Sequence, residues 1–117
     1  NNKKMKIYHN PRCSKSRNTL SIIQEMGNEV EIIEYLNSPP TAKELEVILE
    51  MLNIQPIELI RKNEIIWREN YKGKQMRDDE IINAMRENPK LIERPIVIKN
   101  GKAIIGRPPE KVLNLLF

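Results

Sequence analysis

The C-terminal third of the chain holds the feature that most restricts its fold, two short β-branched runs joined by Asn100 and Gly101. The stretch reads PIVIKNGKAIIG, and an Asn-Gly pair between such runs is typical of a two-residue type I′ turn. The sequence therefore predicts a β-hairpin, and with it a sheet that contains at least one antiparallel pair of strands.

The N-terminal third predicts a strand, a helix and a second strand. The first strand covers residues 6–9, and Pro11 follows it. Apolar residues recur at helical spacing over residues 14–26, and the pair GN then stops the helix. The β-branched run of residues 30–36 predicts the second strand, which ends in the turn-forming sequence NSPP. A helical crossover between two strands implies that they pair in parallel.

Helices are predicted between the second strand and the hairpin. Thr41 and Glu44 form a capping box ahead of one apolar stripe made of Leu45, Ile48, Leu49 and Leu52. Residues 55–77 have a weaker pattern, with a short helix around residues 57–60 and with Trp67, Tyr71 and Gly73 in polar surroundings. Asp78 is expected to cap a further helix that ends at Asn88 and Pro89.

The last predicted element is a helix opened by Pro108 and Pro109, which follow the hairpin. Its apolar residues are expected to pack back onto the sheet, and these are Val112, Leu113, Leu116 and Phe117.

This order of elements predicts an α/β fold with a mixed four-stranded sheet flanked by helices. A helical insertion separates the second strand from the third, and thioredoxin-like folds have this sequence of elements. The 117 residues suit one domain, residues 1–117, because single cores commonly reach this length. We expect residues 1–4 to be a flexible tail.

Composition argues against several classes of function. The net charge of +4 would suit an anionic partner, but no run of five like charges occurs and only one Trp, three Tyr and one Phe are present. A nucleic-acid partner is therefore not expected. With no apolar stretch long enough for a signal peptide or a membrane span, and only one cysteine, we expect a cytoplasmic protein without a membrane partner. One His and one Cys are too few for a tetrahedral metal site, so no metal is expected.

Cys13 is the residue best suited to chemistry, because it directly precedes the first predicted helix. A thiolate there meets the positive end of the helix dipole and unpaired backbone N–H groups, which lower its pKa. His9 lies four residues upstream, and the cations Arg12, Lys15 and Arg17 add to the local field. A structural role stays open for both residues. Cys13 could be a buried hydrophobic residue, and His9 could be hydrogen-bonded to neighbouring backbone.

The spacing around Cys13 excludes two familiar thiol arrangements. Position 16 is Ser, so Cys13 has no partner in a CxxC pair and a second thiol has to come from another molecule. A phosphatase-like loop needs an arginine where this chain has Thr19.

Three arginines at the ends of predicted elements could bind an oxyanion that reacts at the sulfur. They are Arg61, Arg94 and Arg107. Planar guanidinium groups bind such oxygens better than lysine does, although each of the three could equally be a solvated surface residue.

The strings YHNPRCSKSRNTL, ELIRKNE, IERPIVI and GRPPE occur in this order, and with them the chain resembles the glutaredoxin-dependent arsenate reductase family over about residues 6–116. The resemblance implies that Cys13 is the nucleophile, that His9 favours its thiolate, and that the three arginines, Arg61, Arg94 and Arg107, bind arsenate. It also implies a thioredoxin-like fold with a cis peptide bond before Pro95, and supporting roles for Asn10, Ser16 and Arg17. Glutathione would be the co-substrate and glutaredoxin the partner, with no tightly bound cofactor.

The chain departs from the family pattern at Ser14 and Lys15, where well-studied members have Gly-Thr. The implied thiol chemistry carries over better than the implied substrate, and Lys15 adds a charge that could meet another anion or a carboxylate of glutathione. Two alternatives stay open: a regulator similar to Spx, which binds the RNA polymerase α subunit, and a glutathione-linked thiol oxidoreductase with a different substrate.

Overall fold

A computed structural model of the chain describes residues 5–117, which form two units. We call residues 5–38 with 94–117 the sheet unit and residues 39–93 the helical unit. The predicted tail, residues 1–4, lies outside the described residues, and the single domain over residues 1–117 stays a prediction.

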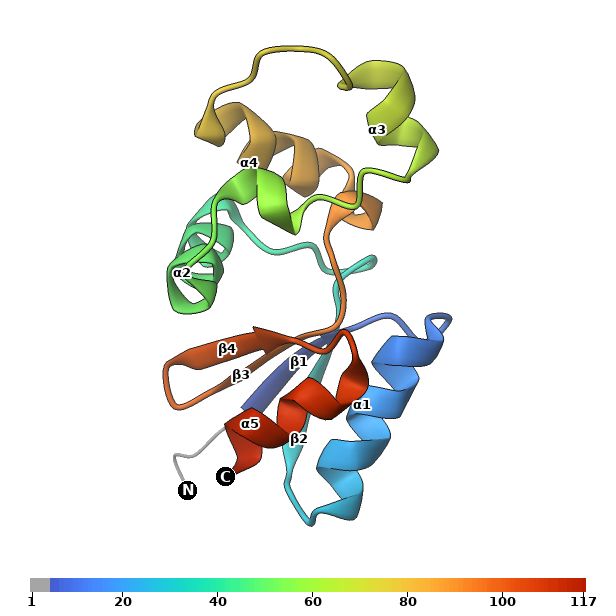
Figure 1. The fold of residues 1–117 in the computed structure, drawn as a ribbon, viewed down its shortest axis with the longest axis vertical. Coiled ribbons are helices and arrows are strands. Elements are labelled where there is room, and N and C mark those ends of the chain that lie inside the picture. The colour runs from blue at the N-terminus through green and yellow to red at the C-terminus, as the bar shows by residue number, and fades with distance from the viewer. Residues whose placement is uncertain (1–4) are drawn as a thin grey trace. The chain divides into compact units, whose positions relative to one another are not determined.

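The sheet unit contains four strands in the order β2-β1-β3-β4 (Figure 1). They are β1 (Met5–His9), β2 (Val30–Glu34), β3 (Ile96–Lys99) and β4 (Lys102–Ile105). Strand β1 pairs with β2 in parallel and with β3 antiparallel, so that Ile7 lies opposite Ile32 on one side and Val97 on the other. The mixed four-stranded sheet confirms the predicted fold class.

The hairpin between β3 and β4 forms where the sequence predicts it. Asn100 has φ 52° and Gly101 has φ 77°, so both central residues have positive φ, as a type I′ turn requires. The turn places Ile96 opposite Ile105, with the residues that follow β4 beside those that precede β3.

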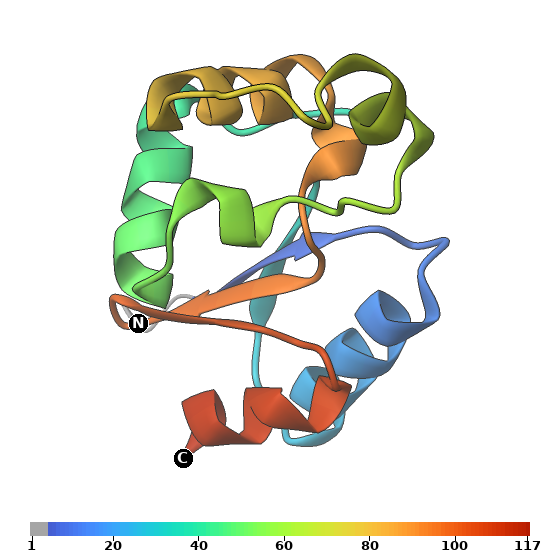
Figure 2. The same cartoon turned by 45° about the horizontal axis from the view of Figure 1, so that its top comes forward.

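One face of the sheet is covered by α1 (Ser14–Glu25), the short 3₁₀-helix η3 (Pro109–Val112) and α5 (Leu113–Leu116). Figure 1 and Figure 2 show α1 and α5 on the same side of the sheet. The core between them contains Met5, Ile7, Ile23, Val97 and Val112, each no more than 2% exposed. Burying such side chains away from water is the main force that holds α1 on the sheet.

Phe117 corrects the prediction for the last helix. Val112 is fully buried and Leu116 packs against the core, as expected, but Phe117 is 87% exposed. Because Leu115 and Leu116 take the positions that face the core, the next residue of the turn is directed toward solvent.

The helical unit contains α2 (Ala42–Leu52), η1 (Pro56–Leu59), α3 (Ile65–Asn70), α4 (Asp78–Glu87) and η2 (Pro89–Leu91). The capping box of α2 is present, because the N–H of Glu44 donates to Thr41 Oγ1 at 3.1 Å and the N–H of Thr41 donates to Glu44 Oε1 at 2.8 Å. No helix within residues 5–117 is long and apolar enough to cross a membrane.

Two details of the helical unit differ from the sequence prediction. Arg77, not Asp78, is the N-cap of α4, because the Arg77 N–H already donates to Glu80 Oε1 at 2.8 Å and Asp78 has entered the first turn. Trp67 is only 7% exposed and stacks on Tyr71 with 5.4 Å between ring centroids. The helix α3 that carries Trp67 was not predicted, because its six residues, IIWREN, are too few to show a helical period.

Candidate active site

Cys13 is the N-cap residue of α1, with extended backbone angles of φ −95° and ψ 122°. Its carbonyl accepts the N–H of Arg17 at 3.0 Å, the first bond of the helix, and its own N–H donates to the carbonyl of Asn10 at 3.0 Å. The sulfur therefore lies at the end of a twelve-residue helix where backbone N–H groups are unpaired. The residue is partly exposed, so reagents can reach it.

Asn10 and Ser16 hold the loop that carries Cys13. Asn10 is buried, and its side-chain Oδ1 accepts the N–H of Arg12 at 3.0 Å while its own N–H donates to Ser16 Oγ at 3.0 Å. Arg17 also supports the loop, because its guanidinium donates to the carbonyl of Pro11 at 2.9 Å. These bonds fix the backbone on both sides of the cysteine.

His9 lies at the end of β1 with its Nδ1 2.7 Å from Ser16 Oγ. It is 6% exposed, and burial lowers its pKa from the ordinary value, although the charge of Glu34 raises it and that of Arg17 lowers it further. The lowered pKa favours the neutral imidazole at pH 7. His9 Nδ1 and Ser16 Oγ share one hydrogen bond, and the hydroxyl, which accepts the Asn10 N–H with one lone pair, can donate to Nδ1 or accept from it. His9 is joined to the cysteine loop through Ser16.

Several groups act on the pKa of the Cys13 thiol in opposite directions. Burial raises the pKa, but the backbone N–H of Ser16, the side chain of Arg94 and the backbone N–H of Lys15 all stabilise the thiolate. The stabilising groups prevail, so the pKa of Cys13 is lowered from the ordinary value of a cysteine.

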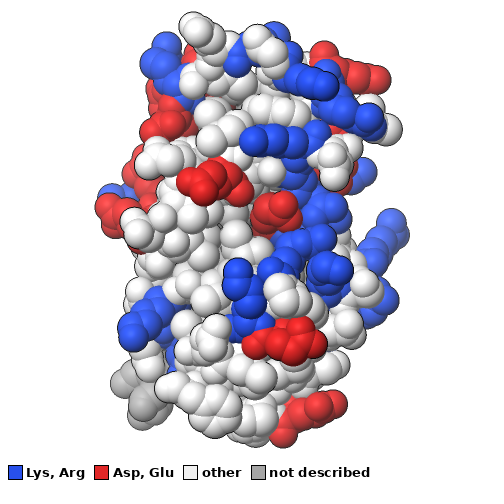
Figure 3. Space-filling model, viewed as in Figure 1, with Lys and Arg blue, Asp and Glu red and all other residues white. Residues whose placement is uncertain are grey.

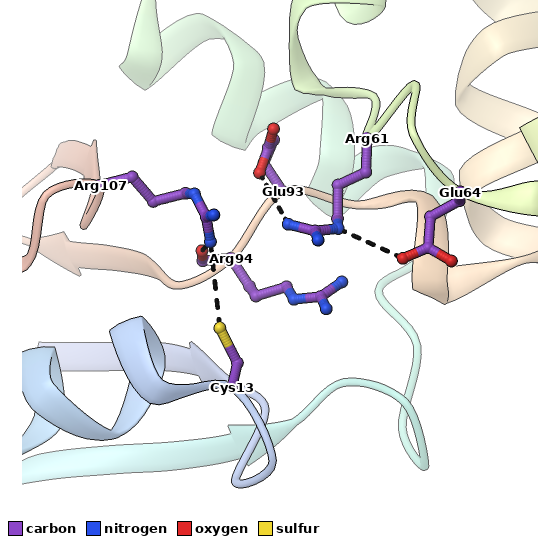
Figure 4. Close-up of polar contacts among 6 residues, drawn as sticks. All are labelled: Cys13, Arg61, Glu64, Glu93, Arg94 and Arg107. Atoms are coloured by element: carbon purple, nitrogen blue, oxygen red, sulfur yellow. Dashed lines mark hydrogen bonds and ion pairs between the residues drawn. The ribbon is translucent and has the colours of Figure 1, made fainter.

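Arg94 and Arg107 reach the sulfur from the hairpin. Arg94 precedes β3 and is followed by a cis peptide bond to Pro95, as expected, whereas Arg107 follows β4. The side chain of Arg94 stabilises the Cys13 thiolate and lowers the pKa of the thiol. Arg107 Nη1 lies 3.9 Å from Cys13 Sγ and donates to the carbonyl of Arg94 at 3.1 Å (Figure 4). Two guanidinium groups therefore lie at one thiolate, although 81 and 94 residues separate them from it along the chain.

Arg61 belongs to the helical unit, where two carboxylates hold it. Its Nε lies 3.5 Å from Glu64 Oε2 and its Nη1 3.3 Å from Glu93 Oε1 (Figure 4). Its backbone N–H donates to the carbonyl of Leu91 at 2.7 Å, in a short bridge between the segments that carry Arg61 and Glu93. The expected part of Arg61 in oxyanion binding stays a prediction.

The surroundings of Cys13 are positively charged. Figure 3 shows basic side chains gathered at the N-terminal end of α1, where Arg12, Lys15 and Arg17 are exposed. An anion approaching this end of α1 meets an attractive field. Within residues 5–117 no group of three or more His, Cys, Asp or Glu side chains could hold a metal ion.

Gly106 and Thr19 border the site and were not singled out from the sequence as functional. Gly106 directly precedes Arg107, and Thr19 is a fully buried residue of α1. The two residues are 87 positions apart in the chain, and only their contact in the folded structure places both at the site.

The fold and the site together define a thioredoxin-like protein that carries one cysteine at the start of its first helix, with two arginines beside the sulfur. Comparison with known proteins narrows this class. The model of the ArsC family matches residues 8–115, and the chain belongs to that family.

The relatives and solved structures agree with this assignment. The uncharacterized protein YfgD of Escherichia coli is 48% identical over 97% of this chain and 98% of its own length. An arsenate reductase of Haemophilus influenzae is 42% identical over 94% of this chain and 97% of its own length. The solved structure of an arsenate reductase from Vibrio cholerae is 43% identical, with a TM-score of 0.92 over 97% of this chain and 98% of that one.

Proposed function

We propose that this chain reduces arsenate to arsenite through Cys13, with glutathione as co-substrate and glutaredoxin as partner. The observation that carries the proposal is a thiol of lowered pKa with the guanidinium groups of Arg94 and Arg107 at its sulfur. Relatives of similar length named arsenate reductase support the choice of oxyanion.

The first step would be attack of the Cys13 thiolate on the arsenic atom. A sulfur–arsenic bond forms, and one arsenate oxygen leaves as water after it has taken up protons. Arg94 and Arg107 suit this step because fixed positive charges near the reacting centre offset the charge on the arsenate oxygens. We assign a third guanidinium, Arg61, to the same task on the basis of its motif ELIRKNE.

The second step would transfer the two electrons. A glutathione thiolate attacks the Cys13 sulfur, the sulfur–arsenic bond breaks with its electron pair on arsenic, and arsenic(V) becomes arsenic(III). The product at the protein is a mixed disulfide between Cys13 and glutathione, which a glutaredoxin thiolate would cleave to restore the Cys13 thiolate. Since Cys13 is the only cysteine of the chain, the reducing thiols have to come from other molecules. Dependence on reduced glutathione suits the cytoplasm as the location.

The proposal is tested by arsenate-dependent oxidation of NADPH in the presence of glutathione, glutaredoxin and glutathione reductase. We expect turnover that disappears when glutathione or glutaredoxin is left out. If the protein turns over a glutathione mixed disulfide but oxidises no NADPH with arsenate, the substrate assigned here is wrong and a general thiol oxidoreductase takes its place.

Replacing Arg107 by Ala is expected to lower kcat/KM for arsenate about a hundredfold, as loss of one preorganised charge donor typically does. Arg86→Ala is the matched control, because Arg86 is an exposed arginine of α4 whose guanidinium bonds Asn83. Equal rates for the two variants would show that the anion does not bind at Arg107.

A further inference from the structure

The residue before Arg107 is packed more tightly than any side chain would permit. A Cβ atom added to Gly106 would lie 2.6 Å from Thr19 Oγ1 and 2.9 Å from Pro95 Cγ, and 3.1 Å from Thr19 Cγ2. Cβ atoms in proteins essentially never show contacts below 3.0 Å. Gly106 is itself buried, so it cannot escape the contact by turning into solvent.

Neither Thr19 nor Pro95 can move away from Gly106 easily. Thr19 is fully buried on α1, and its hydroxyl donates to the carbonyl of Lys15 at 2.8 Å, so a rotation of the side chain breaks that bond. Pro95 is held on the opposite side, since its carbonyl accepts the N–H of Gly106 at 2.9 Å. The glycine backbone therefore lies in a notch between α1 and the residue that opens β3.

The same notch fixes the start of the Arg107 side chain. Immediately after Gly106, the N–H of Arg107 donates back to the carbonyl of Ile105 at 2.8 Å, which turns the chain out of β4. From this backbone position the guanidinium comes to 3.9 Å from Cys13 Sγ and 3.1 Å from the Arg94 carbonyl. A displacement of Gly106 moves the point from which Arg107 extends.

We propose that Gly106 is a positioning residue for Arg107: its missing side chain lets the chain after β4 settle between Thr19 and Pro95, and this seating sets the distance between the guanidinium and the Cys13 sulfur. Gly106 acts on the site only through Arg107 and touches no substrate. The inference deepens the proposed function, since it concerns one of the groups assigned to oxyanion binding. The test of this inference uses no arsenate. The positioning role of Gly106 can therefore be wrong while the proposed reductase activity is right, and the reductase activity can be wrong while the positioning role is right.

The test compares two alkylating reagents at Cys13, the anion iodoacetate and the neutral iodoacetamide. With either reagent the thiolate attacks the carbon that bears iodine, a sulfur–carbon bond forms and iodide leaves. The ratio of the two second-order rate constants reports positive charge beside the sulfur, because changes in the thiolate fraction affect both reagents alike. Since Cys13 is the only cysteine, each rate belongs to one residue.

Arg107→Ala should lower the iodoacetate-to-iodoacetamide ratio about three- to tenfold, as removal of a unit charge a few ångströms from the sulfur would. Gly106→Ala should lower it by a similar factor. In the double variant Gly106→Ala/Arg107→Ala the ratio should equal that of Arg107→Ala alone, because Gly106 acts through the arginine. A merely structural role for Gly106 would lower stability and leave the ratio unchanged.

Rescue gives a second criterion. Thr19→Ala removes both Thr19 atoms that a Cβ at position 106 would meet and leaves the contact with Pro95 Cγ at 2.9 Å, the less severe of the two contacts below 3.0 Å. The pair Gly106→Ala/Thr19→Ala should therefore regain at least half of the lost ratio on a logarithmic scale. If Gly106→Ala does not fold, Thr19→Ile, which adds bulk to the same contact from α1, replaces it and should lower the ratio. An unchanged ratio in Arg107→Ala, in Gly106→Ala or in that replacement overturns the proposal, as does full additivity of the double variant.

Discussion

At the scale of single residues, the chemistry of Cys13 depends on which groups stabilise its charge. Burial opposes the thiolate, and the helix N–H groups together with Arg94 favour it. The cysteine is an N-cap residue, and an N-cap side chain ordinarily accepts backbone N–H groups. A thiolate in this place is stabilised by the backbone N–H groups of Lys15 and Ser16 at the start of α1.

Arg94→Ala is expected to raise the pKa of the Cys13 thiol, because the substitution removes a hydrogen bond and a positive charge from the thiolate. The measurement is the rate of alkylation by iodoacetamide as a function of pH, whose midpoint reports the thiol pKa. The midpoint of the unchanged protein should lie below the ordinary cysteine value and shift upward in the variant. A midpoint that stays in place would show that Arg94 does not stabilise the thiolate.

His9 makes a prediction about stability and pH. Its pKa is lower in the folded chain than the ordinary value of 6.5, so the unfolded chain binds more protons as the pH falls through the window just below 6.5. The contribution of His9 to stability should therefore fall as the pH drops through the ordinary pKa of about 6.5, and it should stop falling below the folded-state pKa. Urea unfolding at a series of pH values measures this effect.

His9→Gln, which cannot titrate, is the comparison for this measurement. It should show a smaller loss of stability over the same window than the unchanged protein does. Because His9 is the only histidine, its imidazole signals in a ¹H NMR titration give the pKa directly. A midpoint above 6.5 would contradict the neutral, Ser16-bonded imidazole.

At the scale of elements, local signals that cap or turn the chain proved dependable. Asn100 and Gly101 form the turn between β3 and β4, and Thr41 with Glu44 caps α2, because these residues satisfy their own backbone within a few positions. The start of α4 was misplaced by one residue for the same kind of reason. The capping bond there uses the Glu80 side chain and the Arg77 backbone N–H, and any residue at position 77 could supply that N–H.

Thr41→Ala is expected to lower the free energy of unfolding by about 1 kcal/mol, since the Glu44 N–H loses its hydroxyl acceptor. Thr41→Ser keeps the hydroxyl and is the matched control, with a change of a few tenths of a kcal/mol at most. Equilibrium unfolding in urea measures both. Equal destabilisation by the two substitutions would show that the methyl group, and not the capping bond, matters at this position.

At the scale of the whole molecule, the sequence alone could predict the class of fold, but not which side chains meet at Cys13. The order of strands and helices follows from periodicity and turn residues. The approach of Arg107 to Cys13 depends on the pairing of β1 with β3 and of β3 with β4, which brings the hairpin beside the strand that leads to the cysteine. A contact between two residues 94 positions apart in the chain depends on side-chain packing throughout the sheet unit, and no local sequence pattern specifies that packing.

The same reasoning explains which site residues were missed. Gly106 and Thr19 are unremarkable in the sequence, and only the 2.6 Å distance across their contact marks them. The sequence left His9 open between a residue that favours the thiolate and a histidine satisfied by neighbouring backbone. In the structure its Nδ1 is bonded to the side chain of Ser16, a partner that the spacing alone did not indicate.

The proposed reaction depends on Cys13 as the nucleophile that takes up arsenate and is then freed by glutathione and glutaredoxin. The most direct test compares arsenite formation by Cys13→Ser with that by the unchanged protein, with glutathione and glutaredoxin both present. Arsenite is separated from arsenate and then quantified. We expect steady arsenite production by the unchanged protein and none above background by the variant, because a serine hydroxyl is almost entirely protonated at neutral pH. Appreciable arsenite from Cys13→Ser would contradict this role of Cys13.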